Sequence, residues 1–67
     1  MDIKVKFGQK VKAIRLEKGI SQEKLAQLSD LDRTYIPSIE KGTTNISIVV
    51  AEKLAKALEV ELKELFK

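Results

Sequence analysis

The side chains best suited to chemistry are the hydrogen-bonding ones gathered in the stretch SDLDRTYIPSIEKG, residues 29–42. Arg33, Thr34 and Tyr35 follow Asp32, and aspartate is a favoured residue at the start of a helix. Consecutive side chains of this kind suit presentation to a partner. Pro37 conflicts with this reading, because proline disrupts the interior of a helix.

Catalysis and metal binding find little support in the residue types. The chain has no histidine and no cysteine, and it has no carboxylate cluster at metal-ligand spacing. The serines all have structural explanations, and none has a candidate base beside it; they are Ser21, Ser29, Ser38 and Ser47. We therefore expect no enzyme, no metal, no small-molecule ligand and no cofactor.

Positive charge is concentrated at the start of the chain. The net charge is +3, but residues 1–18 hold six basic and two acidic groups, which gives +4. Residues 19–50 come to −1, and residues 51–67 balance at four of each sign. A basic end of this kind suggests a polyanion as partner, and the alternative is an ordinary solvated helix face.

Length limits the chain to one small domain. A chain of 67 residues buries only about 60% of the surface that it exposes when unfolded. Without cysteine it has no disulfide to reinforce it, so oligomerisation is a natural source of extra stability. No signal peptide and no membrane-spanning apolar run is evident, and we expect a cytoplasmic protein.

Apolar residues recur at helical spacing almost throughout the sequence. Ile3, Phe7, Val11 and Ile14 form one stripe on a first helix, which is expected to end at Gly19. The second helix is expected to begin after a capping Ser21 and to end near Asp30. Its expected inward residues are Leu25, Ala26 and Leu28.

Three further helices are expected after residue 31. A third helix, capped by Asp32, ends at the second EKG sequence with Gly42, and a fourth begins after Ser47. The expected core stripe of the fourth helix is Ile48, Ala51, Leu54, Ala55 and Leu58, and a last short helix holds Leu62, Leu65 and Phe66. This pattern predicts an all-α, compact bundle of about five helices. The short connection Ser29 to Leu31 sets the second and third helices at a steep angle, which is a helix-turn-helix.

The stretch QEKLAQLSDLDRTYIPSIEKG, residues 22–42, resembles the helix-turn-helix of the phage repressor and Cro family. Within that family, LDRTYI…IEKGTTNIS resembles the controller proteins of restriction–modification systems. The resemblance implies a lambda repressor-like DNA-binding domain over residues 1–67, with the helix-turn-helix at about 21–42 and dimerisation at about 46–67. It also implies a sequence-specific transcriptional regulator that binds an inverted-repeat operator on double-stranded DNA as a homodimer. The alternative is a DNA-binding antitoxin or partner-binding subunit.

The resemblance assigns the outward residues of the third helix to the major groove. The expected base-contacting residues are Arg33, Thr34, Tyr35, Pro37 and Ser38. Arg33 is suited to guanine O6 and N7, and Thr34 to a base edge or a thymine methyl group. Tyr35 either meets the DNA or covers the core. Pro37 either widens the first turn of a helix capped by Asp32, or lies in the first turn of a helix that starts after Thr34.

Three other sets complete the expected site. Phosphate contacts are expected from helix starts and polar loops at Gln22, Lys41, Thr43, Thr44, Asn45 and Ser47. In the family the positions of Arg15 and Glu40 form a structural ion pair between the first and third helices. The expected dimer interface comprises Val49, Val50, Leu62 and Phe66, with Val50 alternatively at the edge of the core. Asp30 stands where the family turn commonly has glycine, and aspartate tolerates the left-handed conformation.

Overall fold

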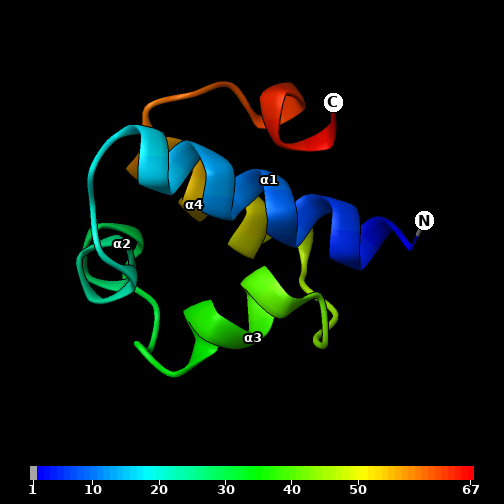
Figure 1. Cartoon of the computed structure of the whole chain (residues 1–67), viewed down its shortest axis with the longest axis horizontal. Helices are drawn as coiled ribbons and strands as arrows, with labels where there is room; N and C mark the ends of the chain where they lie inside the picture. Colours follow the sequence, from blue (N-terminus) through cyan, green and yellow to red (C-terminus); the bar gives the residue numbers. More distant parts are fainter. Residues whose placement is uncertain (1) are drawn as a thin grey trace.

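Four α-helices and one 3-10 helix follow one another along residues 2–67, the part of the chain that the computed structural model describes. They are α1 (Ile3–Glu17), α2 (Gln22–Ser29), α3 (Tyr35–Lys41), α4 (Ile48–Leu58) and η1 (Leu62–Phe66). In Figure 1, α1 crosses the molecule with α3 on one side of it and η1 on the other. The predicted all-α class is confirmed, but the fifth element is a 3-10 turn instead of an α-helix.

Helix starts follow the predicted capping residues at α2 and α4. The Ser21 hydroxyl oxygen accepts a hydrogen bond from the backbone N–H of Lys24 at 3.0 Å. Ser47 accepts one from Val50 at 3.1 Å. Each hydroxyl satisfies a backbone donor that has no partner within the helix, which fixes where the helix begins.

Helix ends depend on residues in the left-handed conformation. Gly19 and Gly42 have φ values of 71° and 77°, as the two EKG sequences predict. Asp30 ends α2 with φ 58°, so aspartate fills the place where the family commonly has glycine. Glu59 ends α4 in the same way, with φ 60°. The turn between α2 and α3 is therefore kept without glycine.

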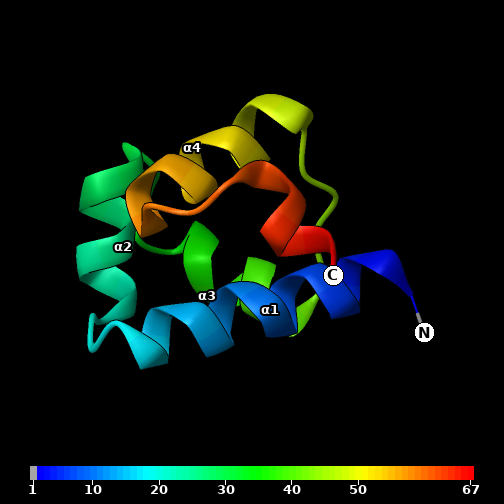
Figure 2. The same ribbon diagram turned by 90° about the horizontal axis from the view of Figure 1, so that it is seen from above.

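The core is one cluster to which all four α-helices and η1 contribute. Seen from above, α1 and α4 lie on either side of α3, and α2 closes one end (Figure 2). The buried apolar residues are Phe7, Val11, Leu25, Ala26, Ile36, Ile39, Ala51, Leu54, Ala55, Leu58 and Leu65. Apart from Ile36 and Ile39 of α3, all of them are among the apolar residues named for the predicted first, second, fourth and last helices.

Three residues that the periodicity placed inward are exposed. Ile3, Leu28 and Ile48 keep 57%, 50% and 66% of their surface accessible. Ile3 and Ile48 are the first residues of their helices, and Leu28 is next to the end of α2. Periodicity identifies one face of a helix, but the ends of that face extend past the neighbouring helices. Ser29 is buried in place of Leu28, and its hydroxyl donates to the Leu25 carbonyl at 2.6 Å.

The start of α3 agrees with the second of the two readings of Pro37. Tyr35 is the first residue of α3, and Thr34 occupies the cap position, although its side chain accepts no hydrogen bond from the helix. Pro37 is then the third residue, where a backbone N–H would have no helical partner. The expectation of a widened first turn in a helix capped by Asp32 is wrong, because the helix begins later and the proline is accommodated without a lost bond.

Helices α1 and α3 approach each other closely at Gly8. A Cβ atom built at Gly8 would lie 2.1 Å from the backbone oxygen of Ile39. The backbone of α3 can lie against α1 at this point only because Gly8 has no side chain. Gly8 therefore determines how closely α3 packs against α1. Along residues 2–67, no helix is both long and apolar enough to cross a lipid bilayer.

Candidate nucleic-acid interface

The turn before α3 is organised by Asp32. Its Oδ1 accepts hydrogen bonds from the backbone N–H of Thr34 at 2.8 Å and from the Thr34 hydroxyl at 2.7 Å. The Asp32 carbonyl accepts a third bond from the Tyr35 N–H at 3.0 Å. The Thr34 hydroxyl and backbone N–H hold the pKa of Asp32 below its ordinary value of 3.8. Asp32 thus fixes a turn ahead of the helix, and Arg33 and Thr34 remain exposed.

Arg33 projects from this turn toward the start of α2. Its side chain is 75% exposed, and its Nη1 lies 3.7 Å from Oε2 of Glu23. Glu23 lies in the first turn of α2 and was not among the expected site residues. In the sequence Glu23 is an ordinary acidic residue in the first turn of a helix, so no sequence signal pointed to its contact with Arg33.

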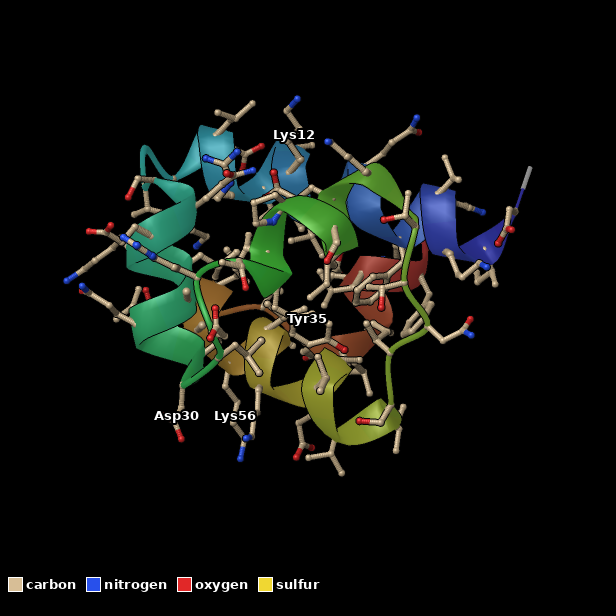
Figure 3. The ribbon with its side chains drawn as sticks, turned by 90° about the horizontal axis from the view of Figure 1, so that it is seen from below. Lys12, Asp30, Tyr35 and Lys56 are labelled. Atoms are coloured by element: carbon tan, nitrogen blue, oxygen red, sulfur yellow. The ribbon has the colours of Figure 1, made fainter. Side chains whose placement is uncertain are left out.

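The other expected base-contacting residues lie on α3 and are half-buried. Tyr35 packs against the core, as one of its two expected roles required, and lies near the middle of the face in Figure 3. Pro37 and Ser38 lie further along α3. The Ser38 hydroxyl donates to the Tyr35 carbonyl at 2.9 Å, which leaves its oxygen to accept a hydrogen bond from a partner. Ile36 and Ile39 face the core.

A buried ion pair fixes the orientation of α3. Arg15 donates from Nε to Glu40 Oε2 at 2.7 Å and from Nη2 to Oε1 at 3.0 Å. The remaining arm of Arg15 donates to the Ile20 carbonyl at 2.9 Å, and Gln22 donates to Glu40 Oε1 at 3.0 Å. Arg15 and Glu40 are only 7% and 8% exposed. Their role is structural, and they link α1, α2 and α3 behind the exposed turn.

The expected phosphate-contacting residues fall into two groups. Gln22 begins α2, and its amide is tied to Glu40. Lys41, Thr43 and Asn45 are exposed at the end of α3 and in the loop that follows, while Thr44 is half-buried. Thr43 donates both its backbone N–H and its hydroxyl to the Ser38 carbonyl, at 3.1 Å and 3.2 Å. In the free protein Thr43 therefore closes α3.

Two exposed lysines lie near the α3 face, one on α1 and one at the end of α3. In Figure 3, which shows the molecule from the α3 side, Lys12 of α1 lies at one edge of the view and Asp30 lies at the end of α2. Lys12 and Lys41 are both exposed. Lys12 and Lys41 therefore add positive potential to this side of the molecule.

A second, apolar surface lies at the N-terminal ends of α1 and α4. Val49 is 61% exposed and Phe66 is 40% exposed, and the Phe66 ring lies 5.2 Å from that of Phe7. Phe66, Ile3 and Ile48 line one hollow of about 230 Å³. Val50 and Leu62 are half-buried against the core. The surface therefore includes Ile3 and Ile48, which the sequence assigned to the core.

The chain is similar to known proteins over almost its whole length. The family described as helix-turn-helix matches residues 11–65. Control protein C.MunI of a Mycoplasma species is 52% identical over 66 residues, which are 97% of this chain and 89% of that protein.

Two solved structures extend the similarity to the fold. The restriction–modification controller protein C.AhdI from Aeromonas hydrophila superposes with a TM-score of 0.91 at 53% identity, over 92% of this chain and 94% of that one. The controller protein C.Esp1396I was solved as a tetramer in complex with its natural 35-base-pair operator. It superposes with a TM-score of 0.86 at 41% identity, over 100% of this chain and 99% of that one.

Proposed function

This chain belongs to the helix-turn-helix family of transcriptional regulators, and we propose that it binds an inverted-repeat operator as a homodimer with α3 in the major groove. The observation that carries the proposal is that α3 buries one set of side chains while the turn at its start exposes another. Ile36, Ile39 and Glu40 are buried, whereas Arg33 and Thr34 are exposed at its start. The related controller protein C.Esp1396I, solved with its operator, supports operator binding by this chain.

In this proposal the base edges are read by Arg33, Thr34, Tyr35, Pro37 and Ser38. The planar Arg33 guanidinium donates to guanine O6 and N7 together, and Thr34 contacts a base edge or a thymine methyl group. Tyr35 offers the exposed part of its half-buried ring, and the Ser38 oxygen offers an acceptor. Each good two-bond contact to a base discriminates by about 1–3 kcal/mol.

Phosphate contacts in the proposal surround these base contacts. They come from Gln22, Lys41, Thr43, Thr44, Asn45 and Ser47. Gln22 is held in place by Glu40, so the carboxylate that pairs with Arg15 also orients a proposed phosphate donor. Such contacts set affinity and register, whereas the base contacts set sequence preference.

The apolar surface supplies the proposed dimer interface. Val49, Val50, Leu62 and Phe66 are its members by sequence, and the exposed Ile3 and Ile48 extend it. A twofold dimer would place two copies of α3 about 34 Å apart, the repeat of one DNA turn. In this proposal the protein acts in the cytoplasm and is not an enzyme.

Two measurements test this function. Selection from a randomised duplex library, followed by footprinting on the gene's own upstream DNA, should recover one inverted repeat in both. A dimer that neutralises about 6–10 phosphates should lose affinity with a log–log salt slope of about −5 to −9. If no sequence is enriched and upstream DNA competes no better than random DNA, the regulator proposal is wrong. Recovery of one tight protein partner in place of a preferred duplex would favour the antitoxin function.

A further inference from the structure

Glu23 is the acidic side chain that meets the exposed reading turn. Its Oε2 lies 3.7 Å from Nη1 of Arg33, and both side chains are largely exposed, at 63% and 75%. Asp32 is next to Arg33 in sequence, but its Oδ1 is occupied by two hydrogen bonds from Thr34. The carboxylate that pairs with Arg33 therefore comes from α2 and not from the turn itself.

The geometry leaves the reading edge of Arg33 open. Glu23 contacts Nη1, so the donors on Nε and Nη2 have no ion-pair partner among the described residues. A guanidinium has five N–H donors in a fixed plane, which is enough to bond a carboxylate on one side and guanine O6 and N7 on another. Glu23 and a guanine can therefore hold Arg33 at the same time.

We propose that Glu23 is a positioning residue for specificity: it braces Arg33 toward the base edge and keeps the guanidinium from the phosphate backbone. This inference rests on the proposed function. An unbraced arginine has many rotamers, and ordering it on binding is unfavourable. It is also free to bond a phosphate oxygen, a contact that carries no sequence information. The contact with Glu23 therefore weakens non-specific binding of Arg33 to phosphates and strengthens its preference for a particular base.

Glu23→Gln is the first test, because it removes the charge and keeps the size. An exposed ion pair contributes little to folding, so the thermal midpoint should not change. Affinity for the preferred duplex should fall about 3- to 10-fold, which is the low end of the effect of one base contact. Binding to random duplex should be unchanged or tighter, with a salt slope steeper by up to about 1 as Arg33 reaches a phosphate.

Three companion variants separate bracing from simple charge repulsion. Glu23→Asp keeps the charge but has a shorter side chain, so bracing predicts that it behaves like Glu23→Gln. In an Arg33→Ala background, Glu23→Gln should no longer change the base preference, because the two residues act as one unit. Glu61→Gln is the matched control, since Glu61 forms a similar exposed pair with Lys63 at 3.4 Å just before η1, on the far side of α1 from α3 (Figure 1).

Several results would overturn the bracing role. If Glu23→Gln tightens preferred and random duplexes equally and Glu23→Asp behaves as wild type, Glu23 acts only by repelling phosphates. If Glu23→Gln changes preference even without Arg33, Glu23 reads a base by itself. If the wild-type protein shows no preferred duplex at all, the regulator function fails first and this inference fails with it.

Discussion

Arg15 and Glu40 lie 25 residues apart and form a two-pronged buried ion pair, with N–O distances of 2.7 Å and 3.0 Å between α1 and α3. Gln22 of α2 bonds the same carboxylate at 3.0 Å. The Glu40 side chain therefore links α1, α2 and α3 behind the exposed turn that carries Arg33 and Thr34. The buried side-chain nitrogens and oxygens of the described residues all have partners, so the network is complete.

Removing one member of this pair should be strongly destabilising. Glu40→Leu leaves the Arg15 guanidinium buried without its counter-charge, which typically costs about 3–5 kcal/mol. For a chain of this size that is a large part of the whole stability, and urea unfolding at neutral pH will measure it. The double variant Arg15→Met with Glu40→Leu should recover most of the loss. A Glu40→Leu protein as stable as wild type would show that the pair has no net role.

Gly8→Ala should destabilise the fold through the contact between α1 and α3. The added Cβ would lie 2.1 Å from the Ile39 backbone oxygen, and backbone cannot move aside as a side chain does. Overpacking of this kind costs about 1–3 kcal/mol, measurable by thermal or urea unfolding. Gln9→Ala is the control, because Gln9 is the exposed neighbour of Gly8 on α1 and the change adds no atom to the contact with α3. Equal losses for both variants would contradict the close-approach explanation.

Arg33→Ala and Lys41→Ala should weaken DNA binding in different ways. Loss of Arg33 should cost about 1–3 kcal/mol on the preferred duplex and relax preference at one base pair. Loss of Lys41 should weaken binding to all sequences alike and reduce the salt slope by about 1. Competition assays against single-base variants of the operator distinguish the two results. An unchanged base profile for Arg33→Ala would remove Arg33 from direct readout.

Val49→Asp should disrupt the dimer while leaving each subunit folded. Val49 is 61% exposed, so a charge there does not enter the core, but it would be buried without a partner across a twofold interface. Sedimentation should show a monomer, and operator affinity should fall because two linked half-sites become independent. Leu28→Asp is the control, since Leu28 is similarly exposed, at 50%, but is not among the residues of the apolar surface. A Val49→Asp protein that remains dimeric would place the interface elsewhere.

The turn held by Asp32 should weaken in acid. Hydrogen bonds from Thr34 lower the pKa of Asp32 below 3.8, so the folded state binds this proton less readily than the unfolded state. Its contribution to stability is therefore complete above that ordinary value and is lost as pH falls through the lowered pKa. The difference in stability between wild type and Asp32→Asn should shrink over this range. Urea unfolding across the acid range, with the Thr34 amide followed by NMR, will show it; a constant difference would contradict the role of the charge.

Helix boundaries could be predicted from the sequence where a single residue type determines them. Ser21 and Ser47 mark helix starts, and Gly19 and Gly42 mark helix ends, because each position needs a particular side chain or a positive φ. The position of the helix-turn-helix followed from these boundaries and from the short connection between α2 and α3. The ion pair of Arg15 with Glu40 came from the family resemblance, and the structure contains it.

Exposure and contacts that depend on tertiary packing could not be predicted in the same way. Ile3 and Ile48 have the spacing of core residues, yet they sit on helix ends that no neighbour covers, so only the packed bundle shows that they are exposed. Glu23 has the signature of an ordinary first-turn acidic residue. Its contact with Arg33 depends on the angle between α2 and the turn before α3, which periodicity does not determine.

The shortness of α3 has a consequence for the proposed DNA binding. Seven residues are too few to persist as an isolated helix in water, where about 12–15 are already marginal. Helix α3 is therefore ordered only while the surrounding body is folded, and a peptide copied from it would be unstructured. If the proposed operator binding is correct, warming that melts the body should abolish it, and bound DNA should in turn raise the melting temperature.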